Sequence, residues 1–176
     1  WVVSAEGTSL DRRVLTYSPA LLKIFDELLV NAIDRNALYP KDVNAISVAV
    51  DDSTGAITVE NTGPLGGLAV EVHETHGVFN PELIFGHLMT STNYDDSVKR
   101  IVGGRNGYGA KLCNVYSRQF SIKIRDHVNK KTYNQHWIEN MRQCMKPNIR
   151  SFSGATSSVS VTFVPDWTRF SMSGLE

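Results

Sequence analysis

The chain has 176 residues, 41% of them hydrophobic and 20% charged, and its 18 basic and 18 acidic side chains give a formal net charge of zero. Such a composition is typical of one globular domain with a sizeable core. It argues against a dedicated nucleic-acid-binding domain, which would be more basic. No apolar run approaches the length of a membrane span, so we expect no membrane partner. Two cysteines without disulfide-like spacing predict reduced thiols.

A long helix is predicted near the start of the chain. Ser18 and Pro19 are typical of an N-cap residue and the first helical position. Apolar residues then recur at helical spacing to about Asn36, and Pro40 lies beyond the expected end. The pattern therefore predicts an amphipathic helix over residues 19–36.

Three polar residues of this helix, Glu27, Asn31 and Asp34, are spaced so that they share one stripe of its surface. A carboxylate that reaches a water molecule can act as a general base. An asparagine oxygen is a hard ligand of the kind that Mg²⁺ prefers. The same spacing is also typical of a solvated polar face, so the spacing by itself leaves both interpretations open.

The middle of the chain is predicted to form a hairpin, a loop and a short helix. Residues 46–51 and 56–61 are rich in β-forming residues and flank a sequence, Asp52-Ser53-Thr54-Gly55, that suits a hairpin turn. Residues 61–67 form a turn-rich loop. Asn80-Pro81 begins a short helix that is expected to reach Leu88.

The second half of the chain is predicted to be mainly β-structure after one helix. We expect a helix over 107–117, strands over 120–125, 132–139 and 159–164, and mostly loop over 140–158. Together with the first half, this pattern predicts an α+β fold. Its form is a two-layer α/β sandwich, in which a mixed, mostly antiparallel sheet carries helices on one face.

A glycine-rich run, from Gly103 to Lys111, precedes the apolar part of the helix predicted over 107–117. Glycines let a backbone approach a ligand closely, and a helix N-terminus offers unpaired N–H groups, so the run predicts a phosphate cradle. It is not a Walker A loop, because Ala110 precedes the lysine and Leu112 follows it. It also lacks the third glycine of a dinucleotide fingerprint. A flexible surface loop remains the plain alternative.

Several segments of the chain resemble the motifs of a known family of ATPases. Residues 27–34 look like the E-x-x-x-N-A-x-D helix of the GHKL ATPases. Residues 83–88, the T-S-x-N-Y-D-D run at 90–96 and the G-G-R-N-G-Y-G-A-K run at 103–111 resemble the ATPase domain of eukaryotic-type DNA topoisomerase II. The similarity extends over nearly the whole chain. It implies the GHKL (Bergerat) version of the predicted sandwich and a single ATPase domain over residues 1–176.

The resemblance also implies a role for individual residues. Glu27 matches the general base, Asn31 the Mg²⁺ ligand, and Lys111 a cationic contact that assists catalysis at the triphosphate. Residues 90–106 are expected to be a mobile lid over the nucleotide. The residues expected to bind ATP are Asn31, Asp34, Asn61, Ser91, Thr92, Asn93, Gly104, Arg105, Asn106, Gly107, Tyr108, Gly109, Ala110, Lys111 and Thr162.

The implied function is that of the N-gate of a type IIA DNA topoisomerase, an enzyme that uses Mg-ATP to close a homodimer and drive DNA strand passage. DNA would be bound through the full-length enzyme. The family places the transducer and DNA-cleavage domains outside the region matched by this chain, so we expect the fragment alone to bind ATP and hydrolyse it weakly. The expected location is the nucleus for a cellular protein and the host cytoplasm for a large cytoplasmic DNA virus.

One departure from the family pattern lies at residues 61–67. Asn61 and Gly63 are in place, but about two extra residues follow and the usual Ile-Pro pair is missing, which leaves the roles of Gly66 and Gly67 undefined. The departure favours a divergent member, such as a protist or large-DNA-virus version. The alternatives are another GHKL ATPase, of the chaperone, mismatch-repair or histidine-kinase type, or a non-catalytic nucleotide-sensing module.

Overall fold

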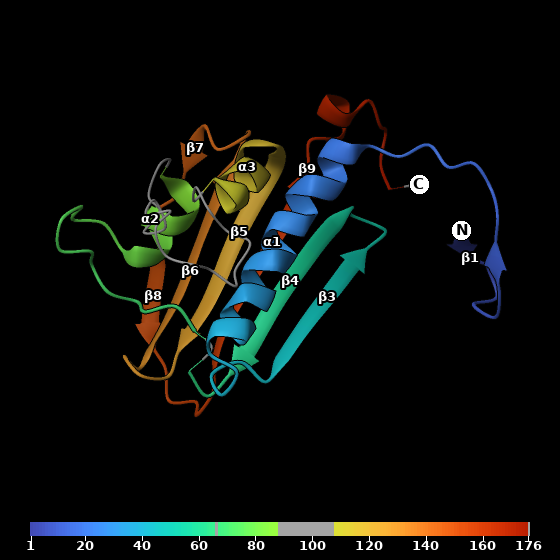
Figure 1. Cartoon of the computed structure of the whole chain (residues 1–176). Helices are drawn as coiled ribbons and strands as arrows, with labels where there is room; N and C mark the ends of the chain where they lie inside the picture. Colours follow the sequence, from blue (N-terminus) through green and yellow to red (C-terminus); the bar gives the residue numbers. More distant parts are fainter. Residues whose placement is uncertain (66, 88–107, 176) are drawn as a thin grey trace, which may run out of the picture.

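The computed structural model describes residues 1–65, 67–87 and 108–175. A seven-stranded sheet forms one layer and the helices cover one of its faces, with α1 lying across β4 (Figure 1). The strands follow the order β3-β4-β9-β5-β6-β7, and β8 also pairs with β6. The α+β two-layer prediction is confirmed. Every described strand pair is antiparallel, so the sheet has no parallel component in this part of the chain.

The strands of the sheet are β3 (Ala45–Asp51), β4 (Ala56–Gly63), β5 (Ser117–Asp126), β6 (Lys131–Ile138), β7 (Gln143–Cys144), β8 (Asn148–Ser151) and β9 (Ser157–Pro165). The hairpin predicted around residues 52–55 joins β3 to β4. A separate pair of two-residue strands, β1 (Val2–Val3) and β2 (Leu10–Asp11), lies apart from the sheet near the N-terminus (Figure 1).

The long first helix, α1, spans Pro19–Leu38, two residues further than predicted. Its N-cap is the predicted Ser18, whose Oγ accepts a hydrogen bond from the Leu21 N–H at 3.4 Å. The other helices are α2 (Asn80–Gly86), α3 (Gly109–Val115) and the 3₁₀ turn η1 (Trp167–Phe170). Leu88, the predicted end of the short helix, lies outside the described residues.

The hydrophobic core lies between α1 and the sheet. Ile24, Leu28 and Ala32 of α1 are buried, and they recur at the predicted helical spacing. Alternate residues of the strands face them, among them Val59 of β4 and Val161 of β9, which are register partners. The period of two along each strand therefore separates a face covered by helices from a face that none of the described helices covers.

In the second half of the chain one predicted helix boundary is wrong, and a segment predicted to be mostly loop also contains two short strands. The helix predicted over 107–117 ends at Val115, and Ser117 already belongs to β5. The segment 140–158, predicted to be mostly loop, contains β7 and β8. Both strands are short and mostly exposed, so their side chains show none of the alternation by which a half-buried strand is recognised.

Candidate functional site

The polar stripe of α1 lies beside its buried face. The Glu27 side chain is 26% exposed, Asn31 is exposed and Asp34 is half-buried. Three of the predicted site residues therefore project from one side of the same helix. Their exposure permits a small molecule to reach Glu27 and Asn31 from outside.

Glu27 has one described ion-pair partner on its own helix. The Lys23 Nζ atom lies 2.7 Å from Oε1 of Glu27, one helical turn away. The hydrogen bond and the charge of Glu27 raise the pKa of Lys23. Exposed i,i+4 pairs of this kind contribute little to stability. Lys23 is not among the predicted site residues, although its spacing from Glu27 is the signal for such a pair.

The other oxygen of Glu27 faces the start of α3. A Cβ atom added at Gly109 would overlap Oε2 of Glu27, and it would also lie 2.9 Å from the Glu27 Cβ atom. Only glycine permits so close an approach between the two helices. The end of the glycine-rich run therefore contacts the predicted general base, and two motifs that are far apart in sequence meet at this point.

Lys111 lies in the first turn of α3 and is only 2% exposed. Burial disfavours the charged amine and lowers the pKa of Lys111. The neighbouring Ala110 is buried in the core. A buried lysine of this kind is stabilised by an anion that comes within reach of its ammonium group, which is what the predicted phosphate contact requires.

Asn61 lies on the helix-covered face of the sheet. It is 8% exposed, and its register partners are Ile46 of β3 and Val159 of β9. Since Val59 on the same face belongs to the core, Asn61 points into the layer between sheet and helices. This position is compatible with the predicted contact to adenine or ribose.

Thr162 lies on the opposite face of the sheet. It is the register partner of Thr58, and the two hydroxyl oxygens are 2.8 Å apart. Its neighbours in β9, Val161 and Phe163, point into the core, so the side chain of Thr162 points away from α1 and α3. The prediction that Thr162 contacts the nucleotide therefore does not suit the structure. The error was one of strand parity: Val159, Val161 and Phe163 alternate with polar residues, and this alternation already places Thr162 on the other face.

Of the remaining predicted site residues, only those from Tyr108 onward belong to the described part of the chain. Tyr108 occupies the N-cap position of α3 and is half-buried. The predicted lid and the predicted contacts Ser91, Thr92, Asn93, Gly104, Arg105, Asn106 and Gly107 lie outside the described residues, as does Gly66.

Asn31 fits a role as a metal ligand. Mg²⁺ is commonly held by only one or two protein oxygens together with substrate phosphates, so one exposed amide oxygen beside Glu27 is a suitable donor. In the described part of the chain, no group of three or more His, Cys, Asp or Glu residues forms a metal site of another kind.

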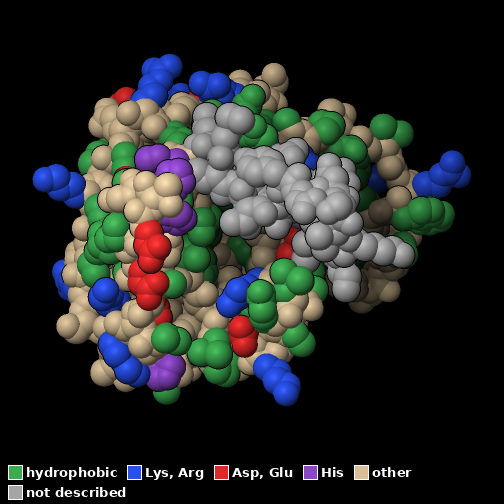
Figure 2. Space-filling view, turned by 60° about the vertical axis from the view of Figure 1, so that its left-hand side comes forward, with side chains coloured by type: hydrophobic (Ala, Val, Ile, Leu, Met, Phe, Trp, Pro, Cys, Tyr) green, Lys and Arg blue, Asp and Glu red, His purple; other side chains and the backbone are tan. Residues whose placement is uncertain are grey.

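No extended basic patch is seen among the coloured side chains of the face shown in Figure 2. Among the coloured side chains, lysine and arginine stand singly between acidic and apolar groups. No helix of the described residues is long and apolar enough to cross a membrane.

A model of the family described as "Histidine kinase-, DNA gyrase B-, and HSP90-like ATPase" matches residues 16–164. The chain belongs to this family of ATP-binding domains. The matched residues include α1, α3 and Asn61, which lie on one face of the sheet.

Within this family, the chain is similar to the ATPase region of eukaryotic DNA topoisomerase II. It is 46% identical to DNA topoisomerase 2 of Penicillium chrysogenum and 42% identical to that of Saccharomyces cerevisiae, in both cases over 100% of this chain. The chain spans only 11% and 12% of the length of these two curated relatives.

Solved structures agree with the sequence relatives. The ATPase region of Saccharomyces cerevisiae topoisomerase II superimposes with a TM-score of 0.92 at 42% identity, covering 100% of this chain and 46% of that one. The ATPase and transducer domains of the Balamuthia mandrillaris enzyme give 0.88 at 41% identity, covering 97% and 43%. The resemblance seen in the sequence is thereby confirmed, and the chaperone, mismatch-repair and histidine-kinase alternatives are not favoured.

Proposed function

We propose that this chain is the Mg-ATP-dependent N-gate of a type IIA DNA topoisomerase. The observation that carries the proposal is the contact between Gly109 and the Glu27 carboxylate. It brings the end of the glycine-rich run to the side chain proposed as general base. A non-catalytic nucleotide sensor has no need of an accessible carboxylate at this point.

The chemistry is assigned to the chain's own residues. Glu27 accepts a proton from the water that attacks the γ-phosphate, and its partial exposure leaves room for that water. Asn31 offers the oxygen that would hold Mg²⁺, which when bound neutralises charge on the phosphate oxygens. Lys111 places positive charge at the triphosphate, and Asp34 and Asn61 help to orient the nucleotide.

The wider role concerns the complete protein. ATP binding would close a homodimer around a DNA segment, and DNA would be held by domains other than this one. Support for this role comes from the similarity over the full length of the chain to topoisomerase II ATPase regions. The mixed charge of the face in Figure 2 agrees with a domain that binds nucleotide rather than DNA. The location would be the nucleus, or the host cytoplasm for a viral protein.

A DNA relaxation assay on the complete natural protein tests this proposal. Supercoiled plasmid should be relaxed with Mg-ATP and left unrelaxed without nucleotide. ATP hydrolysis without any change in DNA topology would instead identify another ATPase of the same family. Absence of both activities would favour the nucleotide-sensing alternative.

A further inference from the structure

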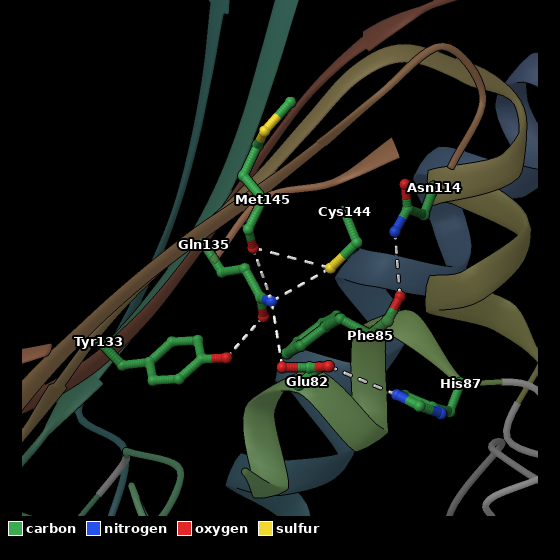
Figure 3. A network of polar contacts seen from close by, with 8 residues as sticks. All are labelled: Glu82, Phe85, His87, Asn114, Tyr133, Gln135, Cys144 and Met145. Carbon is green, nitrogen blue, oxygen red and sulfur yellow. Dashed lines mark hydrogen bonds and ion pairs between the residues drawn. The ribbon is translucent and has the colours of Figure 1, made fainter. Parts of the chain in front are cut away.

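The short helix α2 is held in place by buried polar contacts (Figure 3). It has only seven residues and no side-chain N-cap, so it cannot be stable without tertiary contacts. Gln135 of β6 donates from Nε2 to Glu82 at 3.2 Å and to the Met145 carbonyl at 3.1 Å. At the other end of the helix, a Cβ added at Gly86 would come within 2.9 Å of the Trp137 ring.

The link between α2 and α3 is made by Asn114. Its Nδ2 group donates to the Phe85 carbonyl oxygen at 3.1 Å, and both groups are buried. The last carbonyls of a helix have no partner within that helix, so Asn114 satisfies one that α2 leaves open. The contact joins the end of α2 directly to the last turn of α3.

Burial of the Asn114 amide costs stability, which packing alone does not explain. Asn114 is 0% exposed, and its Oδ1 atom has no hydrogen-bond partner in the described part of the chain. A buried acceptor without a partner is destabilising, and leucine has the same branched skeleton without that acceptor. The hydrogen bond that the amide donates to Phe85 is therefore the contact that leucine could not replace.

Helix α3 is the element that this donor fixes. On one side, the first turn of α3 lies against Glu27 at Gly109, and on the other side Asn114 ties the helix to α2. Its end is held as well, because the Asp166 N–H donates to the Tyr116 carbonyl at 2.8 Å. A shift of α3 at Asn114 would move Gly109 and Lys111 relative to Glu27.

We propose that Asn114 is a positioning residue for ATP hydrolysis: it acts through α3 to hold Lys111 and Gly109 in register with the Glu27 carboxylate. Asn114 does not touch the nucleotide. The inference rests on the proposed function, because it takes Glu27 and Lys111 as the groups that must be aligned. Misplacement of reacting groups by about 1 Å can cost on the order of a hundredfold in rate.

The test compares three variants of the complete protein by steady-state ATP hydrolysis and thermal unfolding. Asn114→Leu removes the donor and keeps the branched skeleton of the side chain. Asn114→Asp keeps the shape and can donate to Phe85 only when its carboxyl group is protonated. Thr58→Val is the matched control, since it removes one half-buried side-chain hydrogen bond on the face of the sheet without helices. All rates are measured well below the lowest unfolding temperature.

We expect Asn114→Leu to lower kcat on the order of tenfold to a hundredfold, with a smaller change in KM. Thr58→Val should leave both constants unchanged. The rate of Asn114→Asp, relative to wild type, should rise as the pH falls and exceed that of Asn114→Leu, which purely structural damage would not produce.

Wild-type kcat in Asn114→Leu, with a loss of thermal stability like that of Thr58→Val, would overturn the inference and leave the proposed function intact. If Asn114→Leu does not fold, a pH profile of Asn114→Asp parallel to that of wild type would overturn it instead. Failure of the wild-type protein to hydrolyse ATP would refute the proposed function itself.

Discussion

Two carboxylates of this chain lie in opposite surroundings. Glu27 is partly exposed and has Lys23 as its described ion-pair partner on α1. Asp166, at the end of β9, is 5% exposed and accepts hydrogen bonds at 2.8–3.1 Å from four side chains: Arg118, Asn140, Thr168 and Arg169. The Glu27 carboxylate can still accept a hydrogen bond from a water molecule. Both oxygens of Asp166 already accept hydrogen bonds from protein side chains.

The pKa of Asp166 reflects this arrangement. Burial alone would raise the pKa, but the hydrogen bonds and the charge of Arg118 outweigh it and lower the pKa to about 2. A carboxylate held in this way has a structural role, since chemistry at its oxygens would require those donors to leave. Accessibility and hydrogen-bond saturation together therefore separate a candidate catalytic carboxylate from a structural one.

The largest expected effect comes from Glu27→Ala. It should lower the rate of ATP hydrolysis by about 10²- to 10⁴-fold, because a general base is lost. Nucleotide affinity should change little, since Glu27 is proposed to bind water rather than ATP. Steady-state hydrolysis and calorimetric titration with a non-hydrolysable ATP analogue measure the two quantities. Undiminished hydrolysis would remove Glu27 from the role of base.

Lys111→Ala should have the next largest effect, on nucleotide affinity. Loss of a charge-assisted hydrogen bond costs about 1.5–3 kcal/mol, or about 10- to 100-fold in the dissociation constant. The pKa of Lys111 is lowered by burial, so wild-type affinity should also fall at alkaline pH, before an exposed lysine would lose its charge. Equal affinity of variant and wild type in calorimetry would contradict the phosphate contact.

Asp166→Asn should reduce stability and leave hydrolysis unchanged at temperatures where the variant is folded. We expect a loss of about 1–3 kcal/mol near neutral pH, because several hydrogen bonds lose their charged acceptor. Denaturant unfolding of both proteins measures this difference.

The pH dependence of that difference follows from the lowered pKa of Asp166. A carboxylate whose pKa is lower in the folded state contributes stability above its unfolded pKa, near 3.9, and loses it as the pH falls toward about 2. The gap between wild type and Asp166→Asn should therefore narrow between about pH 5 and pH 2. A constant gap over this range would show that Asp166 does not titrate as described.

Thr162→Val should have the smallest effect. Its side chain lies on the face of the sheet without helices, where it pairs with Thr58. We expect unchanged nucleotide affinity and a loss of stability of roughly 1 kcal/mol or less. A clear loss of affinity in calorimetry would restore Thr162 to the nucleotide site and contradict its assignment to that face.

Local signals in the sequence determined much of this protein. The cap at Ser18, the helical period of α1 and the β-rich runs on either side of residues 52–55 each depend on neighbours in the chain, and all three predictions are confirmed. The motif at residues 27–34 and the glycine-rich run were enough to identify the ATPase family. They did so through their resemblance to the motifs of known ATPases, because the chemistry of the residues by itself left a solvated helix face and a flexible loop as alternatives.

Other features depended on contacts between distant parts of the chain. The pairing of Thr162 with Thr58, the approach of Gly109 to Glu27 and the link from Asn114 to Phe85 are set by strand register and helix packing. The short strands β7 and β8 exist because β6 offers its edge to them. Such pairings join residues by their position in space, so tertiary structure alone decided which of the polar side chains meet at the candidate site.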